Sequence, residues 1–323
     1  MVAKARNYMH IDEPIVFEPL YMERVWGGRQ LEAVFHKTLP AGTRIGESWE
    51  VVDREEAQSV VHAGILKGMT LHEIWERMRE PVFGTRFDSE SPRFPLLLKI
   101  LDCQERLSVQ VHPPAKVAPE LNGEPKTEMW YVVEARLDAD LFAGFKPGVG
   151  RADFERALDT GDVADKLHRI EVKAGDAIFI PSGRVHAIGA GNLIIEIQQN
   201  SDTTYRVFDW NRTGLDGKPR QLHIEESLRS IDFNDVEPAL QEMKGELVVE
   251  CEYFRVEKWS LEHAREACGP DTFALFACLE GDLLCAKRRF KPGELFLVSA
   301  SQDDRALVPA GGSASVLRIT IPG

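Results

Sequence analysis

Residues 108–114 read Ser-Val-Gln-Val-His-Pro-Pro and place an amide and an imidazole two positions apart. The run has strand character, so the side chains of Gln110 and His112 point to the same face. A buried amide oxygen beside an imidazole nitrogen is half of a divalent metal site. Taken alone the pair is a weak signal, because a single His in an apolar strand is more often a hydrogen-bonded core residue. The chain offers the other half in Glu128, within Lys-Thr-Glu-Met-Trp-Tyr, and His186, within Ile-Pro-Ser-Gly-Arg-Val-His.

A glycine-rich segment ends at His186 and reads Gly-Asp-Ala-Ile-Phe-Ile-Pro-Ser-Gly-Arg-Val-His. Gly175 and Gly183 permit tight turns, Pro181 fixes its φ angle, and the apolar run is typical of a barrel strand. His186 then begins the next strand and is expected to point inward. This spacing resembles the second conserved motif of the cupin superfamily, a double-stranded β-helix barrel with a metal at its mouth. The Asn that usually stands four residues after the His is replaced by Ala190.

The first cupin motif is altered in a way that points to one family. It usually has His-x-His and then a Glu, whereas Gln110 replaces the first His and Glu128 lies 16 residues beyond His112. Gln-x-His-Pro, then Lys-x-Glu, then the glycine-rich His motif resembles type I mannose-6-phosphate isomerases of the short bacterial form. Further matches within the first 212 residues are Val25-Trp26-Gly27-Gly28, Gly46-Glu47-Ser48-Trp49-Glu50, Pro95-Leu96-Leu97-Leu98-Lys99 and the stretch from Glu196 to Trp210. From about residue 245 the chain matches only in general character.

The resemblance implies a metal centre and a reaction. It implies one Zn²⁺ ion per chain, with the ligands Gln110, His112, Glu128 and His186. Imidazole and carboxylate suit zinc, although without a thiolate these residue types leave Mn²⁺ and Fe²⁺ open. A neutral amide ligand leaves the metal more electrophilic than a second carboxylate would, as suits a Lewis acid acting on a sugar carbonyl. The implied activity interconverts mannose 6-phosphate and fructose 6-phosphate by proton transfer between C1 and C2 through an enediol intermediate.

Cationic and proton-carrying side chains are expected beside the metal, because an oxyanion develops in this reaction. By family position, Arg206 and Glu196 are the expected catalytic residues, and Arg206 can direct two donors onto adjacent oxygens. Lys126 lies two positions before Glu128 and should face the same pocket, where it could bind substrate or relay a proton. Ser108 shares the strand face of the Gln ligand and is a candidate hydroxyl contact to the substrate.

Several of these side chains also have a purely structural interpretation. Without the motif, Arg206 would be assigned to a surface ion pair with Asp202 or Asp209. Lys126 could be a solvated lysine at a strand edge, and Arg184 most simply shapes its loop, although it could help to bind phosphate. No glycine-rich phosphate loop is present, so the sequence identifies no anchor for the substrate phosphate.

The composition argues against some classes of binding partner. Over 323 residues, 39 Lys and Arg against 52 Asp and Glu give a net charge of −13, which argues against nucleic acid. We expect a phosphorylated hexose as the partner, and a monomer or small homo-oligomer. Five cysteines without Cys-x-x-Cys spacing favour reduced thiols in a cytosolic protein. No stretch approaches the ~18 apolar residues of a membrane span, so we expect no membrane contact and a cytoplasmic location.

Short apolar runs punctuated by Gly and Pro predict a mainly β fold. We expect two cupin-like double-stranded β-helix barrels of the jelly-roll type, with a few short helices. The runs with strand character are 57–62, 96–101, 107–112, 129–134, 176–180, 193–199, 247–258, 272–278, 294–298 and 315–321. Helices are predicted at 71–79, after the N-cap Thr70 with Glu73 three residues on, at 151–168 with a break near Gly161, and at 223–231.

A polar, acidic segment at 233–245 separates two sets of strands. We therefore expect residues 1–240 to form the catalytic metal-binding domain, with small helical segments, and residues 241–323 to form a C-terminal cupin-like barrel. The stretch 292–298 echoes 174–180 as a weak internal repeat of one β-turn-β unit. No His follows the second copy, so the C-terminal barrel is expected to lack metal ligands.

Two other classes of function remain open. One is a different metal cupin, such as a cupin-type phosphoglucose isomerase or an Fe(II) oxygenase. Gln110 disfavours both, since oxygenases typically use two His and one carboxylate. The other is a sugar-sensing cupin or inactive paralogue. The sequence shows no appended helix-turn-helix, and the intact metal set with Arg206 argues against an inactive barrel.

Overall fold

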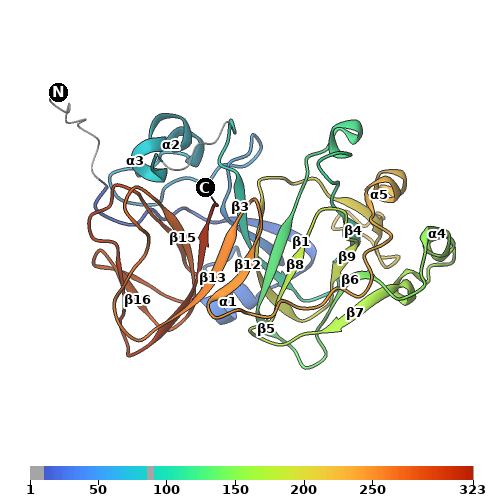
Figure 1. Cartoon of the computed structure of the whole chain (residues 1–323). Helices are drawn as coiled ribbons and strands as arrows, with labels where there is room; N and C mark the ends of the chain where they lie inside the picture. The colour runs from blue at the N-terminus through green and yellow to red at the C-terminus, as the bar shows by residue number, and fades with distance from the viewer. Residues whose placement is uncertain (1–10, 86–90, 323) are drawn as a thin grey trace. The chain divides into compact units, whose positions relative to one another are not determined.

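The computed structural model describes residues 11–85 and 91–322. Strands dominate it and the helices are few and short, which confirms the prediction of a mainly β chain (Figure 1). The chain divides into two compact units, each assembled from separate stretches of sequence. Unit 1 comprises Met1–Pro19, Glu50–Pro95 and Met243–Gly323, and unit 2 comprises Leu20–Trp49 and Leu96–Glu242.

Unit 2 is built on two sheets. The first has six strands in the order β1-β2-β3-β10-β5-β8. These strands are β1 (Leu20–Gly28), β2 (Ile45–Val51), β3 (Leu96–Cys103), β10 (Asn192–Gln199), β5 (Glu128–Ala135) and β8 (Ala177–Ile180). The second sheet has five strands in the order β11-β4-β9-β6-β7. These are β11 (Tyr205–Phe208), β4 (Val109–Val111), β9 (His186–Ile188), β6 (Asp140–Phe145) and β7 (Leu167–Glu171).

The central strands of the six-stranded sheet are buried on both faces. All eight residues of β3 are buried, including Lys99 in the middle of an apolar run. In β10, Ile195 and Ile197 are fully buried on one face, while Glu196 and Gln198 occupy the other. Burial of apolar side chains accounts for the stability of such strands, whereas the buried charges on the other face require partners.

The helices of unit 2 follow local signals in the sequence. The predicted helix at 151–168 is α4 (Arg151–Thr160), and it ends where Gly161 adopts φ +84° as a left-handed cap. A short 3₁₀ turn, η2 (Val163–Lys166), follows, and residues 167–168 already belong to β7, so the prediction extended too far. The helix predicted at 223–231 is α5 (Ile224–Ser230). Neither α1 (Gln30–Phe35) nor the 3₁₀ turn η1 (Ala118–Leu121) was predicted.

Unit 1 also contains two sheets. The five-stranded sheet has the order β12-β13-β20-β15-β18 and the four-stranded sheet has the order β14-β19-β16-β17. The strands are β12 (Leu247–Glu250), β13 (Arg255–Leu261), β20 (Ala314–Thr320), β15 (Ala274–Glu280), β18 (Leu295–Val298), β14 (Arg265–Glu266), β19 (Ala306–Pro309), β16 (Leu283–Cys285) and β17 (Arg288–Phe290). Their inner faces enclose an apolar core that includes Phe276, Phe290 and Phe296.

Two N-terminal stretches belong to unit 1, although the sequence suggested a single division at about residue 240. A backbone bridge joins Ile15 to Leu297, and the ring of Phe83 packs edge-on against Phe273 at 5.0 Å. These contacts connect segments far apart in the sequence, and no local composition signal marks them. Only the later boundary, between residues 242 and 243, lies close to the expected division.

The helical part of unit 1 follows the prediction closely. Helix α2 (Leu71–Arg77) begins with a capping box, in which the Glu73 amide donates to Thr70 Oγ1 and the Thr70 amide donates to the Glu73 carboxylate. A second short helix, α3 (Arg79–Phe83), follows it. The prediction of a strand at 57–62 is wrong. Only isolated bridges form there, and the backbone makes its hydrogen bonds with neighbouring loop residues. Within the described residues, no helix has the length and apolar character that crossing a membrane requires.

Candidate active site

Three polar side chains lie in a row across the five-stranded sheet of unit 2. In the strand register Arg206 stands opposite Gln110, and Gln110 stands opposite His186. Cross-strand partners project from the same face of a sheet roughly 5 Å apart, so the three side chains are neighbours. Strand pairing therefore brings together residues that the sequence offered in three separate motifs.

His112, Glu128 and His186 form a buried group, which we call the His–Glu–His cluster. His112 Nε2 lies 3.4 Å from Glu128 Oε2, and His186 Nε2 lies 3.6 Å from Glu128 Oε1. One potential ligand atom of each residue lies within 4.8 Å of the others. None of the three residues is more than 1% exposed. Two imidazoles and a carboxylate that converge in this way can hold a transition metal.

Both imidazole rings are oriented by backbone carbonyl groups. His112 Nδ1 lies 2.8 Å from the carbonyl oxygen of Thr203, and His186 Nδ1 lies 2.9 Å from that of Arg184. A ring nitrogen that donates to a carbonyl carries the proton, so Nε2 of each ring carries a lone pair. Lys126 Nζ approaches the Nε2 of His112, and Gln110 Nε2 approaches that of His186, each at 3.3 Å. Burial, assisted by repulsion from the His112 ring, lowers the pKa of His186 to about 3. The neutral, metal-ligating form of this ring is therefore the stable one.

Glu128 is ionised although it is fully buried. Burial alone would raise the pKa of Glu128, but Lys126 and the two histidines hold it well below its usual range. Lys126 Nζ lies 2.8 Å from Glu128 Oε2 and pairs with it, whereas Glu128 Oε1 accepts no hydrogen bond from the described residues. A buried carboxylate with unused lone pairs requires a further positive partner, and a divalent metal fits that requirement.

Gln110 borders the cluster on the side of the cavity. Its Nε2 lies 3.3 Å from His186 Nε2, and its Oε1 accepts a hydrogen bond of 3.2 Å from Ser108 Oγ. A half-turn of the amide group exchanges the two positions and directs Oε1 toward the cluster. Gln110 can thus serve as a fourth, neutral ligand, with Ser108 beside it.

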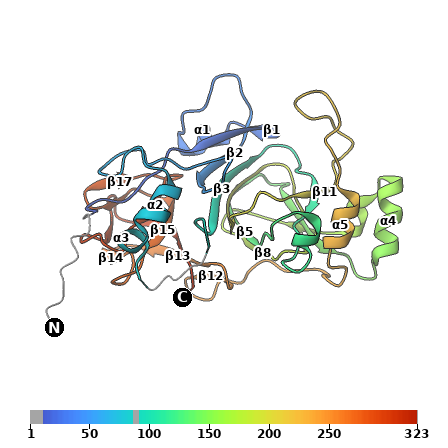
Figure 2. The ribbon, with the colours of Figure 1, turned by 90° about the horizontal axis from the view of Figure 1, so that it is seen from above.

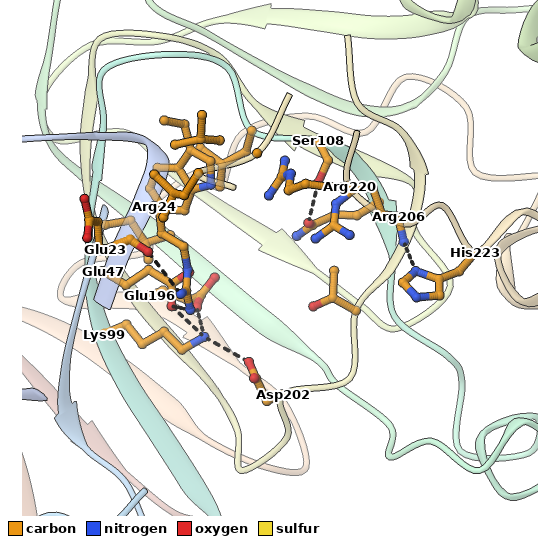
Figure 3. A pocket seen from close by; sticks show the side chains of 18 of the residues that line it. Glu23, Arg24, Glu47, Lys99, Ser108, Glu196, Asp202, Arg206, Arg220 and His223 are labelled. Carbon is orange, nitrogen blue, oxygen red and sulfur yellow. Dashed lines mark hydrogen bonds and ion pairs between the residues drawn. The ribbon is translucent and has the colours of Figure 1, made fainter. Parts of the chain in front are cut away.

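A cavity of about 530 Å³ opens next to the cluster, and we call it the pocket (Figure 3). Lys126 and Gln110 belong both to its lining and to the surroundings of the cluster. Figure 3 shows two sets of polar and charged side chains that face each other across this cavity. One side carries Glu23, Arg24, Glu47, Lys99, Glu196 and Asp202, and the other carries Ser108, Arg206, Arg220 and His223.

Arg206 forms neither of the ion pairs, with Asp202 or with Asp209, that would have given it a purely structural role. Asp202 Oδ1 lies 3.9 Å from Lys99 Nζ, and Asp209 pairs with two other arginines. Arg206 Nη1 donates to the carbonyl oxygen of Gln221 at 2.9 Å. Its Nε is buried and has no hydrogen-bond partner among the described residues. The guanidinium therefore faces the pocket with donors still unused.

The structure also distinguishes between the structural and the functional interpretations of Lys126 and Arg184. Lys126 is only 3% exposed, so it is not a solvated lysine at a strand edge. Arg184 makes two hydrogen bonds of 2.7 and 2.8 Å to the carboxylate of Asp235, and one to the carbonyl oxygen of Phe179. Arg184 thus connects its own loop to a later segment and does not line the pocket.

Comparison with known proteins assigns the chain to a family. Residues 16–138 match the family described as phosphomannose isomerase type I, catalytic domain. A mannose-6-phosphate isomerase of Bacillus subtilis is 38% identical over 308 residues, which cover 93% of this chain and 94% of the relative. This chain belongs to the type I phosphomannose isomerase family. A mannose-6-phosphate isomerase of Streptococcus mutans is 37% identical over 83% of this chain and 85% of its own.

Solved structures agree with membership of the type I phosphomannose isomerase family. The crystal structure of the mannose 6-phosphate isomerase from Bacillus subtilis superposes with a TM-score of 0.84 at 32% identity, and it covers 96% of this chain and 100% of its own. A phosphomannose isomerase variant from Salmonella typhimurium gives a TM-score of 0.73 at 16% identity. At that identity the likeness concerns the fold alone.

In this phosphomannose isomerase family member, sequence reasoning missed several charged residues of the pocket, among them Lys99, Glu47 and Arg24. Lys99 Nζ lies 3.5 Å from Glu196 Oε2 and 3.8 Å from Glu47 Oε2. Arg24 donates twice to the Glu47 carboxylate, at 2.8 and 3.3 Å. Glu196 Oε1 also accepts a hydrogen bond of 3.1 Å from the indole of Trp130. Lys99 had one sequence signal, because a lysine inside the apolar run Leu-Leu-Leu-Lys-Ile requires a buried partner.

Proposed function

We propose that this chain interconverts mannose 6-phosphate and fructose 6-phosphate by moving a proton between C1 and C2 of the sugar. The observation that carries the proposal is the shared boundary of the pocket and the His–Glu–His cluster. Lys126 and Gln110 line the pocket, and they lie 2.8 Å from Glu128 and 3.3 Å from His186. A sugar phosphate in a cavity of about 530 Å³ can therefore reach the cluster with its carbonyl end.

We propose Zn²⁺ as the metal, one ion per chain, with Gln110, His112, Glu128 and His186 as ligands. Two imidazoles with an Nε2 lone pair each and one ionised carboxylate are ligands that zinc accepts. The set carries a single negative charge, so the centre keeps a net positive charge. When bound, the metal supplies a Lewis acid that polarises a sugar oxygen.

The cations beside the cluster have an electrostatic task in this proposal. Burial alone would lower the pKa of Lys126, but Glu128 and Glu196 raise it above its usual range. Lys126 therefore remains protonated at neutral pH and stabilises negative charge on a sugar oxygen, rather than accepting a proton. Arg206 adds a second cation on the neighbouring strand, and the Ser108 hydroxyl offers a hydrogen bond to the substrate.

Two carboxylates of the pocket differ in their affinity for protons. Burial alone would raise the pKa of Glu47, but Lys99 and Arg24 lower it to about 2. Burial raises the pKa of Glu196, and here Lys126 and Lys99 only partly oppose the effect. Groups with separated proton affinities in one pocket are suited to different roles. We assign Glu196 to proton transfer and Glu47 to fixing the positions of Arg24 and Lys99.

The activity is tested with a coupled assay that offers mannose 6-phosphate and glucose 6-phosphate in parallel. We expect turnover of mannose 6-phosphate alone, and preference for glucose 6-phosphate would favour a phosphoglucose isomerase instead. Dialysis against a chelator should abolish turnover, and Zn²⁺, Mn²⁺ or Fe²⁺ added separately would identify the metal. Full activity in verified metal-free protein would contradict the metal requirement.

The residue roles are tested with single substitutions. Arg206→Ala and Glu196→Gln should each lower kcat at least about tenfold, with the metal content unchanged by elemental analysis. Arg184→Gln serves as a control, because Arg184 lies outside the pocket lining. Near-normal turnover in either active-site variant would refute the role of that residue.

We propose that both units are cupin-like double-stranded β-helix barrels, and that the metal site belongs to the part of the chain up to residue 240. The orders β3-β10-β5-β8 and β13-β20-β15-β18 support this, since they repeat one arrangement of strands. Where Lys99 stands opposite Glu196 in unit 2, Glu257 stands opposite Arg318 in unit 1, with the charges exchanged. Within the described residues, the only convergent group of His, Cys, Asp and Glu is the His–Glu–His cluster of unit 2.

We further propose a cytoplasmic enzyme that acts as a monomer or small homo-oligomer and does not bind nucleic acid. The net charge of −13 supports the last point, because it disfavours contact with a phosphate backbone. Cell fractionation tests the location. Sedimentation equilibrium tests the oligomeric state against the chain mass of 36.3 kDa.

A further inference from the structure

A short hairpin on the arginine side of the pocket holds two arginines on one carboxylate. Residues 213–219 turn back on themselves, with a bridge from Thr213 to Pro219 and a 2.7 Å hydrogen bond from the Gly214 amide to the Lys218 carbonyl. The hairpin follows β11 and precedes α5, and in Figure 2 a gold loop projects from unit 2 between these two elements. Arg212 and Arg220 flank the hairpin, so the turn brings both side chains to the same place.

Asp209 is the shared partner of these two arginines. Arg220 forms a two-pronged contact with it, from Nε to Oδ2 at 2.7 Å and from Nη2 to Oδ1 at 2.5 Å. Arg212 Nε and Nη2 both donate to Oδ1, at 3.0 and 2.9 Å, and Arg212 also donates to the carbonyl oxygen of Arg106. Asp209 is only 6% exposed, so this arrangement is fixed inside the protein.

Only one of the two arginines reaches the pocket. Arg220 lines the pocket together with Gly214, Leu215 and Asp216 of the hairpin, whereas Arg212 does not. Figure 3 shows Arg220 beside Ser108 and Arg206. Nη1 of Arg220 takes no part in the contacts with Asp209, so its two N–H groups remain available for a ligand.

The charges on this side of the pocket are unbalanced. Arg206 has no ion-pair partner among the described residues, and Arg220 shares its single buried carboxylate with Arg212. Burial and the proximity of Arg220 both lower the pKa of Arg206, which reports the repulsion between the two guanidinium groups. An anion placed between Arg206 and Arg220 would remove this repulsion and use their remaining donors.

The opposite side of the pocket cannot take an anion. It carries four carboxylates, Glu23, Glu47, Glu196 and Asp202, against two cations. Lys99 Nζ already lies 3.5–3.9 Å from three of these carboxylates, and Arg24 is paired with Glu47. A phosphate dianion there would be repelled by these carboxylates. The phosphate group of a substrate must therefore lie on the arginine side, with its sugar directed toward Glu196 and the cluster.

We propose that Arg220, oriented by Asp209 and carried by the 213–219 hairpin, binds the phosphate group of the substrate together with Arg206. The assignment rests on the proposed function, because a sugar phosphate is the substrate class. It adds a residue that no motif in the sequence identified. Arg212 shares Asp209 but does not line the pocket, so we assign it no part in phosphate binding.

Arg220→Gln is the test variant, and Arg212→Gln is its matched control. The test variant would keep a hydrogen bond to Asp209 through its amide group and lose the charge, whereas the control removes an equivalent bond to Asp209 outside the pocket. For Arg220→Gln we expect the KM for mannose 6-phosphate and the inhibition constant for inorganic phosphate to rise about 10- to 100-fold, as when one charge-assisted contact is lost. For Arg212→Gln we expect both constants to stay within about threefold of the parent protein.

Binding of inorganic phosphate to the metal-loaded protein, measured by calorimetry, separates this inference from the proposed function. If the parent protein turns over no mannose 6-phosphate, the proposed function fails, and phosphate affinity still tests Arg220. Phosphate affinity and KM that remain unchanged in Arg220→Gln would overturn the inference, whatever the activity. An equal loss in Arg212→Gln would overturn it as well, because both changes would then act through Asp209. Arg220→Lys provides a second variant, with recovery of part of the phosphate affinity as the expected result.

Discussion

The substitution Glu47→Gln removes one negative charge from the pocket and leaves the shape of the side chain almost unchanged. Glu47 accepts two hydrogen bonds from Arg24 and one of 2.6 Å from the indole of Trp49, and it lies 3.8 Å from Lys99 Nζ. Its side chain is 12% exposed, so solvent screens these interactions little. The charge state of Glu47 is therefore tied closely to the folded structure.

The size of the effect follows from the pKa of Glu47, which is about 2 against a usual value of 4.5. A carboxyl group with a lowered pKa stabilises the folded protein above its unfolded pKa. That stabilisation is lost as the pH falls toward the folded pKa. The difference corresponds to about 3.4 kcal/mol at pH 7, at about 1.36 kcal/mol for each pKa unit. At about pH 3.5 the same relation leaves about 2 kcal/mol.

Urea unfolding of the parent protein and of Glu47→Gln at about pH 7 and about pH 3.5 measures this difference. We expect the variant to be less stable at both values, and the gap in the free energy of unfolding should narrow by about 1.4 kcal/mol at the lower pH. Glu18→Gln is a control, because Glu18 is an exposed carboxylate of unit 1. A gap that does not change with pH would refute the reasoning, since Glu47 would then not be ionised with a lowered pKa.

Three further substitutions test other parts of the structure. Glu128→Gln removes the carboxylate between the two histidines, so the metal content should fall at least about tenfold by elemental analysis, and retained metal would contradict its role as a ligand. Lys126→Met leaves the Glu128 carboxylate buried without its cation, and in chelator-treated protein this should cost about 3–5 kcal/mol in urea unfolding. Metal should reduce that loss, and an equal loss with and without metal would argue against a shared site. Thr70→Ala removes the hydroxyl of the capping box, with an expected cost of about 1 kcal/mol and an unchanged kcat, and full stability would show that the cap is dispensable.

Local patterns in the sequence were sufficient for several elements. Thr70 and Glu73 predicted the start of α2, and Gly161 predicted a break at the point where α4 ends, because capping depends on residues within one helical turn. The apolar runs that became β3 and β10 were also recognisable, since both strands are buried on both faces.

Several strands were not predicted because they are too short to show an alternation of apolar and polar residues. β17 has three residues and β14 has two, so neither shows an alternation that can be read from sequence. Residues 57–62 show the opposite error, because their backbone forms only isolated bridges and does not pair within a sheet. The N-terminal stretches of unit 1 could not be predicted, since their partners lie far along the chain.

The sequence by itself determined which side chains are available for the chemistry. Gln110, His112, Glu128 and His186 stand in motifs that resemble those of one metal-binding family, so their residue types and their spacing along the chain can be read directly. Tertiary structure decided which other charges share the pocket, because strand pairing and the 213–219 hairpin bring Lys99, Glu47 and Arg220 to it from distant segments. It also decided their protonation, since burial and the nearest charge set the pKa of each carboxylate, and neither quantity exists before the chain folds.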